Sequence, residues 1–507
     1  MNIKQAKQEI TNTLKAYLAK DQLGNYLIPT VRQRPVLLMG PPGVGKTQIM
    51  EQIAAETGVG LVAYTITHHT RQSAIGLPFI EKRTYGGEEV SVTEYTMSEI
   101  LSSVYRLMER TGLQEGILFL DEINCVSETL APMMLQFLQC KTFGNQALPE
   151  GWLIVAAGNP PEYNKSVRDF DVVTLDRVKR IDVEEDYGVW KEYARRKNLH
   201  GAILSYLDIK KDNFYRIENT ADGLQFATAR GWEDLSELLY AYETLGIRAD
   251  REVVGQYIQM PRIAKDFANY LEMFYKYQKT YHVEGILSGT WENITVLELR
   301  EAPFDEKLSG MGLVLSRLSE EARNTRCQDA LTDALHTSLT EFREKIADAP
   351  PLTVLDQLLW KRRTAMKQAK EAGQLDKESR DLKQREINAL EDYRQRLDRE
   401  AVAPEGAMDA VRGWFGEEVE RRKAVAMETK DMFDNAFRFL ETTFGNSQEL
   451  VIFVTEITVG YNTSWFVEQF GCDAYFRHNR ELLFDSTRHR IREEIAAAKA
   501  AEQEENT

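Results

Sequence analysis

The sequence has few cysteines and no long apolar run. Its four cysteines are widely separated, with no CxxC pair, at Cys125, Cys140, Cys327 and Cys472. This spacing excludes a disulfide framework and the common pattern of a structural zinc site. No apolar run approaches the roughly 20 residues of a membrane-spanning helix, and the first residues lack the apolar core of a signal peptide. We therefore expect a reduced, cytoplasmic protein without membrane insertion.

Positive charge is also in deficit. The 507 residues carry a formal net charge of -16 at pH 7. An acidic chain repels a phosphate backbone at long range, so protein partners are favoured over broad nucleic-acid binding. The hydrophobic share of 43% and the charged share of 28% are typical of a folded globular protein. A chain of this length exceeds one hydrophobic core, so we expect several domains.

The first part of the chain has the pattern of an α/β domain. Residues 2–19 carry apolar side chains at helical spacing, which predicts an amphipathic helix. Between residues 35 and 186, short apolar runs alternate with helical patterns. This alternation is typical of a parallel sheet covered by helices. We therefore predict one α/β domain over residues 1–186.

The remainder of the chain reads as mostly helical. Residues 187–280 carry apolar side chains at three-to-four spacing, which predicts a small helical domain. Residues 281–428 are predicted to be mostly helical, with an extended stretch at 285–299 and a charged, solvated helical hairpin after Lys361. The aromatic-rich residues 429–507 predict a helical subdomain with its own core. No catalytic constellation stands out in this half.

A phosphate-binding loop follows the first predicted strand. Val36–Met39 runs into GPPGVGKT, which is Gly40, Pro41, Pro42, Gly43, Val44, Gly45, Lys46 and Thr47. Glycines allow close backbone approach, so that successive N–H groups can cradle phosphates at the start of a helix. In this motif the lysine reaches the β and γ phosphates and the threonine hydroxyl ligates Mg²⁺. The loop therefore predicts binding of ATP with Mg²⁺.

Two carboxylates follow a second apolar strand. Residues 117–120 are Ile-Leu-Phe-Leu, and Asp121 and Glu122 come directly after them. At the carboxyl edge of a parallel sheet these side chains would meet the phosphates. Asp121 would then hold Mg²⁺ and Glu122 would activate the attacking water. The alternative is that both acids simply begin a helix, where negative charge suits the dipole.

Four segments in order, GPPGVGKT, LFLDEIN, AAGNP and LDRVKR, resemble the MoxR branch of the AAA+ ATPases. The resemblance covers roughly residues 30–250. It implies a P-loop NTPase with an AAA+ αβα core over residues 1–186 and an α-helical lid over residues 187–280. It also implies an ATP-hydrolysing, chaperone-like ring, of about six subunits, that remodels or activates a protein client. The usual partner of such proteins carries a von Willebrand factor A domain.

The resemblance also implies roles for polar residues after the carboxylates. Asn159 corresponds to sensor 1, although an asparagine before two prolines could simply make a turn. Arg177 and Arg180 lie where the family offers an arginine finger to a neighbouring subunit, and a surface salt-bridge cluster remains the alternative. Arg230 resembles sensor 2, with Ala229 in place of the proline that the family often has.

Two insertions read as hairpins. Residues 80–92 turn at Gly86-Gly87, and residues 142–151 turn at Gly144-Asn145. The first resembles the helix-2 insert and the second the hairpin before sensor 1; both could instead be idle surface hairpins. Two other functions remain open at this point, a nucleic-acid motor and a nucleotide-gated scaffold.

Overall fold

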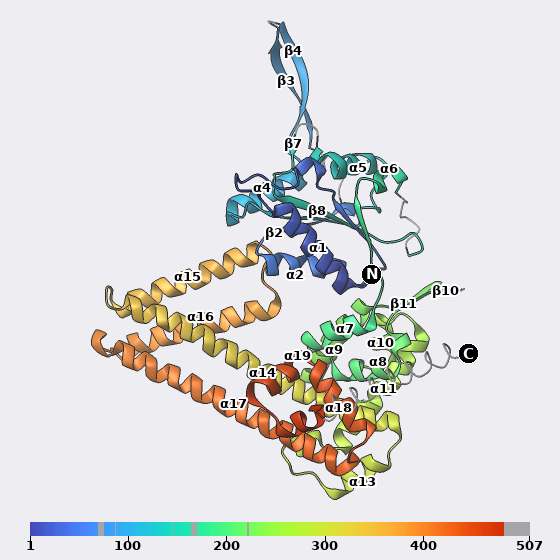
Figure 1. The fold of residues 1–507 in the computed structure, drawn as a ribbon, viewed down its shortest axis with the longest axis vertical. Helices are drawn as coiled ribbons and strands as arrows, with labels where there is room; N and C mark the ends of the chain where they lie inside the picture. The colour runs from blue at the N-terminus through green and yellow to red at the C-terminus, as the bar shows by residue number, and fades with distance from the viewer. Residues whose placement is uncertain (69–75, 87, 144–145, 164–169, 221–222, 481–507) are drawn as a thin grey trace, which may run out of the picture. The chain divides into compact units, whose positions relative to one another are not determined.

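The computed structural model describes residues 1–68, 76–86, 88–143, 146–163, 170–220 and 223–480 (Figure 1). The chain divides into two compact units. The first contains Met1–Val189 and Asp348–Gln395, and the second contains Trp190–Ala347 and Arg396–Thr507. The chain therefore leaves the first unit and returns to it. The predicted fold class is confirmed, with a parallel α/β core followed by a mostly helical part.

A five-stranded parallel sheet forms the centre of the first unit. Its order is β2 (Gly60–Thr65), β5 (Gly116–Asp121), β8 (Trp152–Gly158), β1 (Val36–Met39) and β9 (Lys179–Asp182). β1 and β8 are buried along their whole length. Continuous apolar strands of this kind are expected when helices cover both faces of a parallel sheet.

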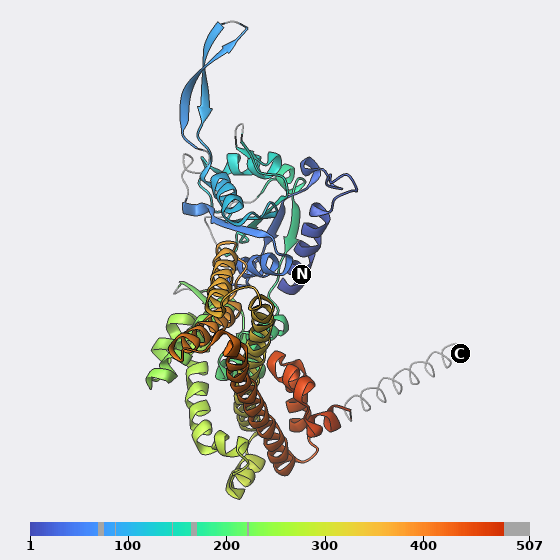
Figure 2. The same cartoon turned by 90° about the vertical axis from the view of Figure 1, so that its left-hand side faces the viewer.

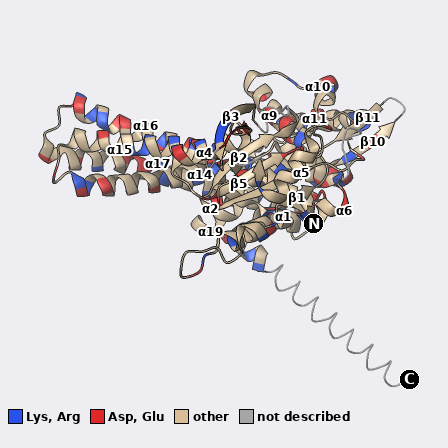
Figure 3. Ribbon diagram, turned by 90° about the horizontal axis from the view of Figure 1, so that it is seen from above, with Lys and Arg blue, Asp and Glu red and all other residues tan. Residues whose placement is uncertain are grey.

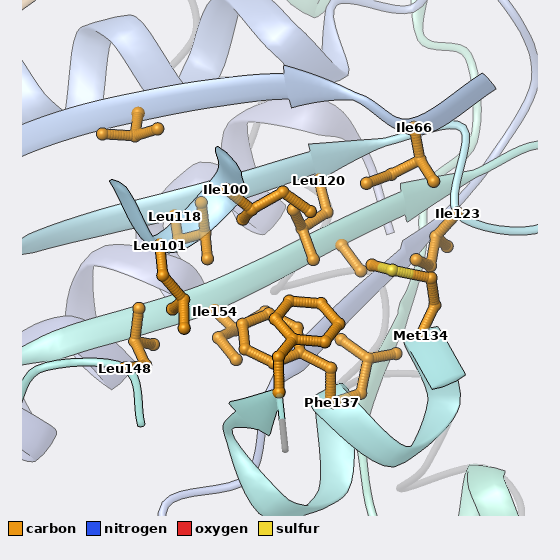
Figure 4. Packing of buried hydrophobic residues seen from close by; sticks show 14 of the residues in the cluster. Ile66, Ile100, Leu101, Leu118, Leu120, Ile123, Met134, Phe137, Leu148 and Ile154 are labelled. Atoms are coloured by element: carbon orange, nitrogen blue, oxygen red, sulfur yellow. The ribbon is translucent and has the colours of Figure 1, made fainter. Parts of the chain in front are cut away.

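Alternate side chains of β5 enter two separate cores. Leu118 and Leu120 pack with α4 (Glu99–Thr111) and α5 (Ala131–Cys140), as Figure 4 shows. Ile117 and Phe119 pack on the other face, with α1 (Ile3–Leu18) and α2 (Lys46–Thr57). Successive residues of a strand point to opposite faces, so a single strand supplies both cores.

Antiparallel ribbons extend this unit. β3 (Pro78–Tyr85) pairs with β4 (Glu88–Tyr95) in a ribbon (Figure 2). β3 is exposed along its whole length, and β4 is exposed except at Val92 and Glu94, which are half-buried. β6 (Thr142–Phe143) pairs with β7 (Gln146–Ala147). Both hairpins were predicted; Gly87 and the turn at Gly144-Asn145 lie outside the described residues. The unit also contains the short helices α6 (Val172–Leu175), η1 (Thr30–Arg32) and η2 (Ile66–His68).

The charged segment forms two antiparallel helices, and it belongs to the first unit. α15 (Pro351–Glu371) and α16 (Lys377–Arg399) carry both signs of charge, as Figure 3 shows. α15 packs on α4. The hairpin is therefore more than a solvated arm, because the chain brings it back to the α/β core.

The second unit, where the structure describes it, is helical apart from one ribbon. Its elements are α7 (Tyr187–Arg196), α8 (Gly201–Ile209), η3 (Lys211–Asn213), β10 (Arg216–Thr220), β11 (Gly223–Ala227), α9 (Ala229–Leu245), α10 (Arg251–Tyr257), α11 (Pro261–Thr280), α12 (Val283–Leu287), α13 (Asn293–Glu301), α14 (Phe304–Lys345), η4 (Pro404–Gly406), α17 (Ala407–Phe444), α18 (Gln448–Val459) and α19 (Tyr461–Phe470). The β10–β11 ribbon was not predicted.

Two observations qualify the helical prediction. The prediction that residues 285–299 are extended is wrong. Most of these residues lie in α12 and α13, where Ile286, Leu287, Val296 and Leu299 are buried. α17 continues through residue 428, where we expected a division of the chain.

Among the described residues, no single helix is long and apolar enough to cross a membrane. One pair bent by 88°, α18 with α19, passes that test by length and composition only.

Candidate nucleotide site

The loop between β1 and α2 has the backbone of a phosphate cradle. Gly43 and Gly45 have φ angles of +77° and +93°, which favour glycine, and α2 begins directly at Lys46. A Cβ on Gly40 would lie 2.7 Å from the carbonyl oxygen of Val183, so no side chain fits there. The backbone N–H groups at the start of α2 suit an anion.

Lys46 is buried inside this loop. Its side chain is only 8% exposed, and Nζ donates to the carbonyl oxygens of Gly40 (2.7 Å) and Pro41 (2.9 Å). Nζ also donates to Oδ1 of Asn159 at 2.9 Å. These acceptors satisfy the donors of an ammonium group, so an incoming phosphate would compete with them for Lys46.

The two predicted metal ligands meet. Oγ1 of Thr47 donates to Oδ2 of Asp121 at 2.9 Å. Hydroxyl and carboxylate oxygens are the hard ligands that Mg²⁺ prefers, and Mg²⁺ usually takes one or two from the protein and others from phosphate and water. Among the described residues there is no cluster of three or more His, Cys, Asp or Glu side chains that could form an all-protein metal cage. The residues therefore fit Mg²⁺ bound together with a nucleotide.

Glu122 is held by a residue that the sequence reasoning missed. Its φ angle is +56°, an uncommon left-handed value for a residue other than glycine. Its Oε2 accepts a hydrogen bond from Oγ1 of Thr67 at 3.0 Å. β2 pairs in parallel with β5, with Thr65 opposite Asp121, so the residues after both strands meet at one edge. The sequence pointed to Thr67 only as a polar residue shortly after the strand beside β5.

A second missed residue lies under the predicted sensor. Asn124 is 3% exposed, and its Nδ2 donates to the backbone oxygen of Asn159 at 2.8 Å. The backbone N–H of Ile123 also donates to the oxygen of Ala157 at 2.9 Å. The segment after β5 is therefore bonded to the end of β8, and this places Asn159 beside Lys46. The only feature of the sequence that pointed to Asn124 is its position two residues after Glu122.

Arg177 and Arg180 pair with residues outside this loop. Arg177 donates to Oε1 of Gln139, and Nε of Arg180 donates to Oδ1 of Asp182 at 2.8 Å. Arg177 precedes β9, which runs parallel to β1, so it lies toward the amino edge of the sheet whereas Lys46 follows the carboxyl edge. Arg230 is exposed in the first turn of α9, in the second unit.

One part of the chain is similar to a known protein family. A solved structure of a RuvB mutant of Thermotoga maritima is 17% identical and aligns with 51% of this chain and 69% of that chain, with a TM-score of 0.28. No curated protein matches the chain significantly. Residues 35–178 match the family model described as the AAA domain of the dynein-related subfamily. This span holds the phosphate loop, the carboxylate pair and Asn159. This part of the chain is therefore similar to the AAA domain of the dynein-related subfamily.

Proposed function

We propose that the chain is an ATP-hydrolysing AAA+ protein of the MoxR type, which remodels or activates a protein client. The observation that carries this proposal is the convergence of polar side chains from separate segments at one edge of the sheet. They are Lys46, Thr47, Asp121, Glu122 and Asn159, linked by the contacts of Lys46 with Asn159 and of Thr47 with Asp121. Such a set can bind a nucleoside triphosphate, hold its metal and activate water.

Each residue has a defined task in this proposal. Lys46 leaves the oxygens of Gly40 and Pro41 and neutralises charge on the β and γ phosphates. Thr47 and Asp121 hold Mg²⁺, which supplies electrostatic stabilisation to the transferring phosphoryl group. Glu122 orients the attacking water and accepts its proton. Asn159 donates a hydrogen bond to that water or to the γ phosphate.

The remaining roles involve other subunits or the second unit. Arg177 or Arg180 would enter the site of a neighbouring subunit in a ring of about six and stabilise charge on the γ phosphate. Arg230 would act as sensor 2 from the helical lid. The position of Arg177 toward the amino edge, away from its own phosphate loop, supports action in trans. A protein with a von Willebrand factor A domain is the proposed partner.

The proposal is tested by nucleotide-dependent capture. Tagged Glu122→Gln protein, which should bind ATP without turning it over, is incubated in native extract with ATP. Lys46→Ala protein serves as the matched control that should not bind ATP. We expect protein clients to be retained by the first and not by the second. Retention of nucleic acid instead, with turnover that nucleic acid stimulates and salt suppresses, would favour a motor and contradict the chaperone role.

A further inference from the structure

The end of α8, η3, the start of β10 and the first turns of α11 surround a hollow in the second unit. Its volume is about 790 Å³, and every residue that lines it belongs to that unit. We call it the basic hollow after its five basic lining residues, which are Lys210, Lys211, Arg216, Arg262 and Lys265. Such a group is unusual in a chain whose formal net charge is -16.

Two of these cations are paired with acids. Nζ of Lys210 lies 2.5 Å from Oδ2 of Asp266, which also accepts a hydrogen bond from the hydroxyl group of Tyr206 at 2.8 Å. Nη1 of Arg216 lies 3.5 Å from Oε1 of Glu218. The carboxylates of the lining are those of Asp208, Asp212 and Asp266. Five cations against three carboxylates leave the basic hollow with an excess of positive charge.

Three cations of the basic hollow remain available to a ligand. Lys211, Arg262 and Lys265 are exposed, and within the described part of the chain none of them forms a side-chain hydrogen bond or ion pair. Arg262 and Lys265 lie about one turn apart on α11, roughly 4.5 Å along its axis, whereas Lys211 belongs to η3. Because these charges are spread over two elements, they suit a ligand with several separate negative charges better than one compact anion.

The lining favours an acidic peptide segment over a nucleic acid. No aromatic residue is among those described as lining the basic hollow, so nucleotide bases would have no ring on which to stack. The acidic chain as a whole also repels a long phosphate backbone. The amide side chains of Asn213 and Asn269 line the hollow as well, and amides can pair with the N–H and C=O groups of a peptide. Clusters of basic side chains are a recurring means of recognising acidic peptide motifs.

We propose that the basic hollow binds an acidic segment of a protein partner through Lys211, Arg262 and Lys265. Carboxylates of the segment pair with these three cations, while Lys210 and Arg216 keep their own acids. Since the rest of the chain is acidic, it repels such a segment elsewhere, and the hollow decides where the segment binds. This inference rests on the proposed function for the identity of the partner as a protein client. The binding step itself needs no nucleotide.

Charge reversal on the full chain tests the proposal. A fluorescently labelled oligoglutamate peptide is titrated with the wild-type protein, and anisotropy measures the Kd. We expect binding that weakens as salt is added. The triple variant Lys211→Glu, Arg262→Glu and Lys265→Glu should raise the Kd about tenfold or more, because three exposed attractions become repulsions.

A matched variant separates the hollow from the net charge of the chain. The changes Arg251→Glu, Lys276→Glu and Lys279→Glu alter the net charge by the same amount, at exposed residues of the second unit that do not line the basic hollow. This variant should bind the peptide with nearly the wild-type Kd. Melting temperatures verify that both triple variants are folded. The neutral variant Lys211→Gln with Lys265→Gln gives a second measurement and should weaken binding by a smaller factor.

Three results would overturn the inference. They are no binding of the peptide by wild-type protein, an equal loss of binding in both triple variants, or tighter binding at the hollow of a single-stranded oligonucleotide or of tripolyphosphate. In each case clients captured by Glu122→Gln with ATP would leave the proposed function standing. Peptide binding at the hollow by a protein that hydrolyses no ATP would contradict the proposed function and leave this site in place.

Discussion

Asn159 and Lys46 are joined by a hydrogen bond of 2.9 Å between Oδ1 and Nζ, although they are 113 residues apart. The bond brings the residue that follows β8 to the loop that follows β1. Asn159 can therefore respond to whatever engages the lysine, and Lys46 can be withdrawn from a phosphate by the same amide.

Asn159→Ala should slow turnover more than it weakens binding. The variant loses a hydrogen bond to the attacking water or the γ phosphate, so kcat should fall about 10- to 100-fold, the range for a bond to a charged group. The nucleotide Kd should change little, because Lys46 also loses an acceptor that competes with phosphate. Steady-state kinetics and calorimetry with ATP measure the two effects. A large loss of affinity with normal kcat would contradict this role.

Lys46→Ala and Glu122→Gln should have separable defects. Removing the ammonium group removes a direct phosphate contact, so Lys46→Ala should weaken ATP binding. Glu122→Gln leaves the phosphate and Mg²⁺ contacts in place, so it should bind ATP and accumulate it without turnover. Equilibrium binding and single-turnover assays distinguish them. Wild-type turnover by Glu122→Gln would show that this carboxylate is not the base.

Lys141 should destabilise the fold at neutral pH. Its side chain is buried with Nζ donating to the backbone oxygen of Thr30 at 3.1 Å, and burial lowers the pKa of Lys141 to about 8. The folded protein therefore disfavours the charged amine. Lys141→Met removes this cost, which is on the order of 3 kcal/mol from the lowered pKa, less the lost hydrogen bond.

The stability gained by Lys141→Met should depend on pH. Below pH 8 both the folded and the unfolded protein carry the proton, so the cost of Lys141 is fully present. Between pH 8 and about 10.5 only the unfolded protein keeps the proton on Lys141. The free energy of unfolding of the wild-type protein therefore rises with pH in this range, and its difference from that of the variant becomes smaller. The difference in melting temperature should be largest at pH 7 and shrink toward pH 10.5. Lys367→Met, at an exposed lysine, serves as the control substitution.

Arg177 and Arg180 can be assigned by mixing subunits. Arg177→Ala keeps an intact nucleotide site but cannot donate the arginine to a neighbour. Lys46→Ala has a defective nucleotide site but still carries both arginines. A finger can contribute about 10³-fold or more to turnover, so each variant alone should be nearly inactive. Mixed rings, with subunit exchange verified by mass, should recover activity above either parent. Arg180→Ala in place of Arg177→Ala shows which arginine acts, and no gain for either would contradict a shared site.

Local patterns explain what the sequence predicted well. The phosphate loop needs glycines at positive φ within a few residues, and Gly43 and Gly45 have such angles. The sequence motif therefore predicts the backbone conformation of the loop directly. Thr67 and Asn124 could not be found in this way. Their partners lie 55 and 35 residues away, and only the strand order brings them close. Their roles depend on tertiary contacts rather than on local sequence.

Errors in the helical part have a similar cause. The β-branched residues Ile294, Thr295 and Val296 favour a strand in isolation, yet α13 buries Val296 and Leu299 at helical spacing. The β10–β11 ribbon was missed although Asp222-Gly223 is a common hairpin signal in a sequence. Packing decided the first case, and unrecognised turn chemistry explains the second.

The return of the chain to its first unit also orders its synthesis. Residues 348–395 emerge from the ribosome long after residue 189, with the bulk of the second unit between them. At about 5–20 residues per second, the delay is roughly 10 to 40 seconds. Throughout this interval the nascent α/β core has no hairpin to cover α4. The last steps of its folding are therefore postponed until translation has passed α16, and a ribosome that stalls before then leaves a core that lacks its hairpin.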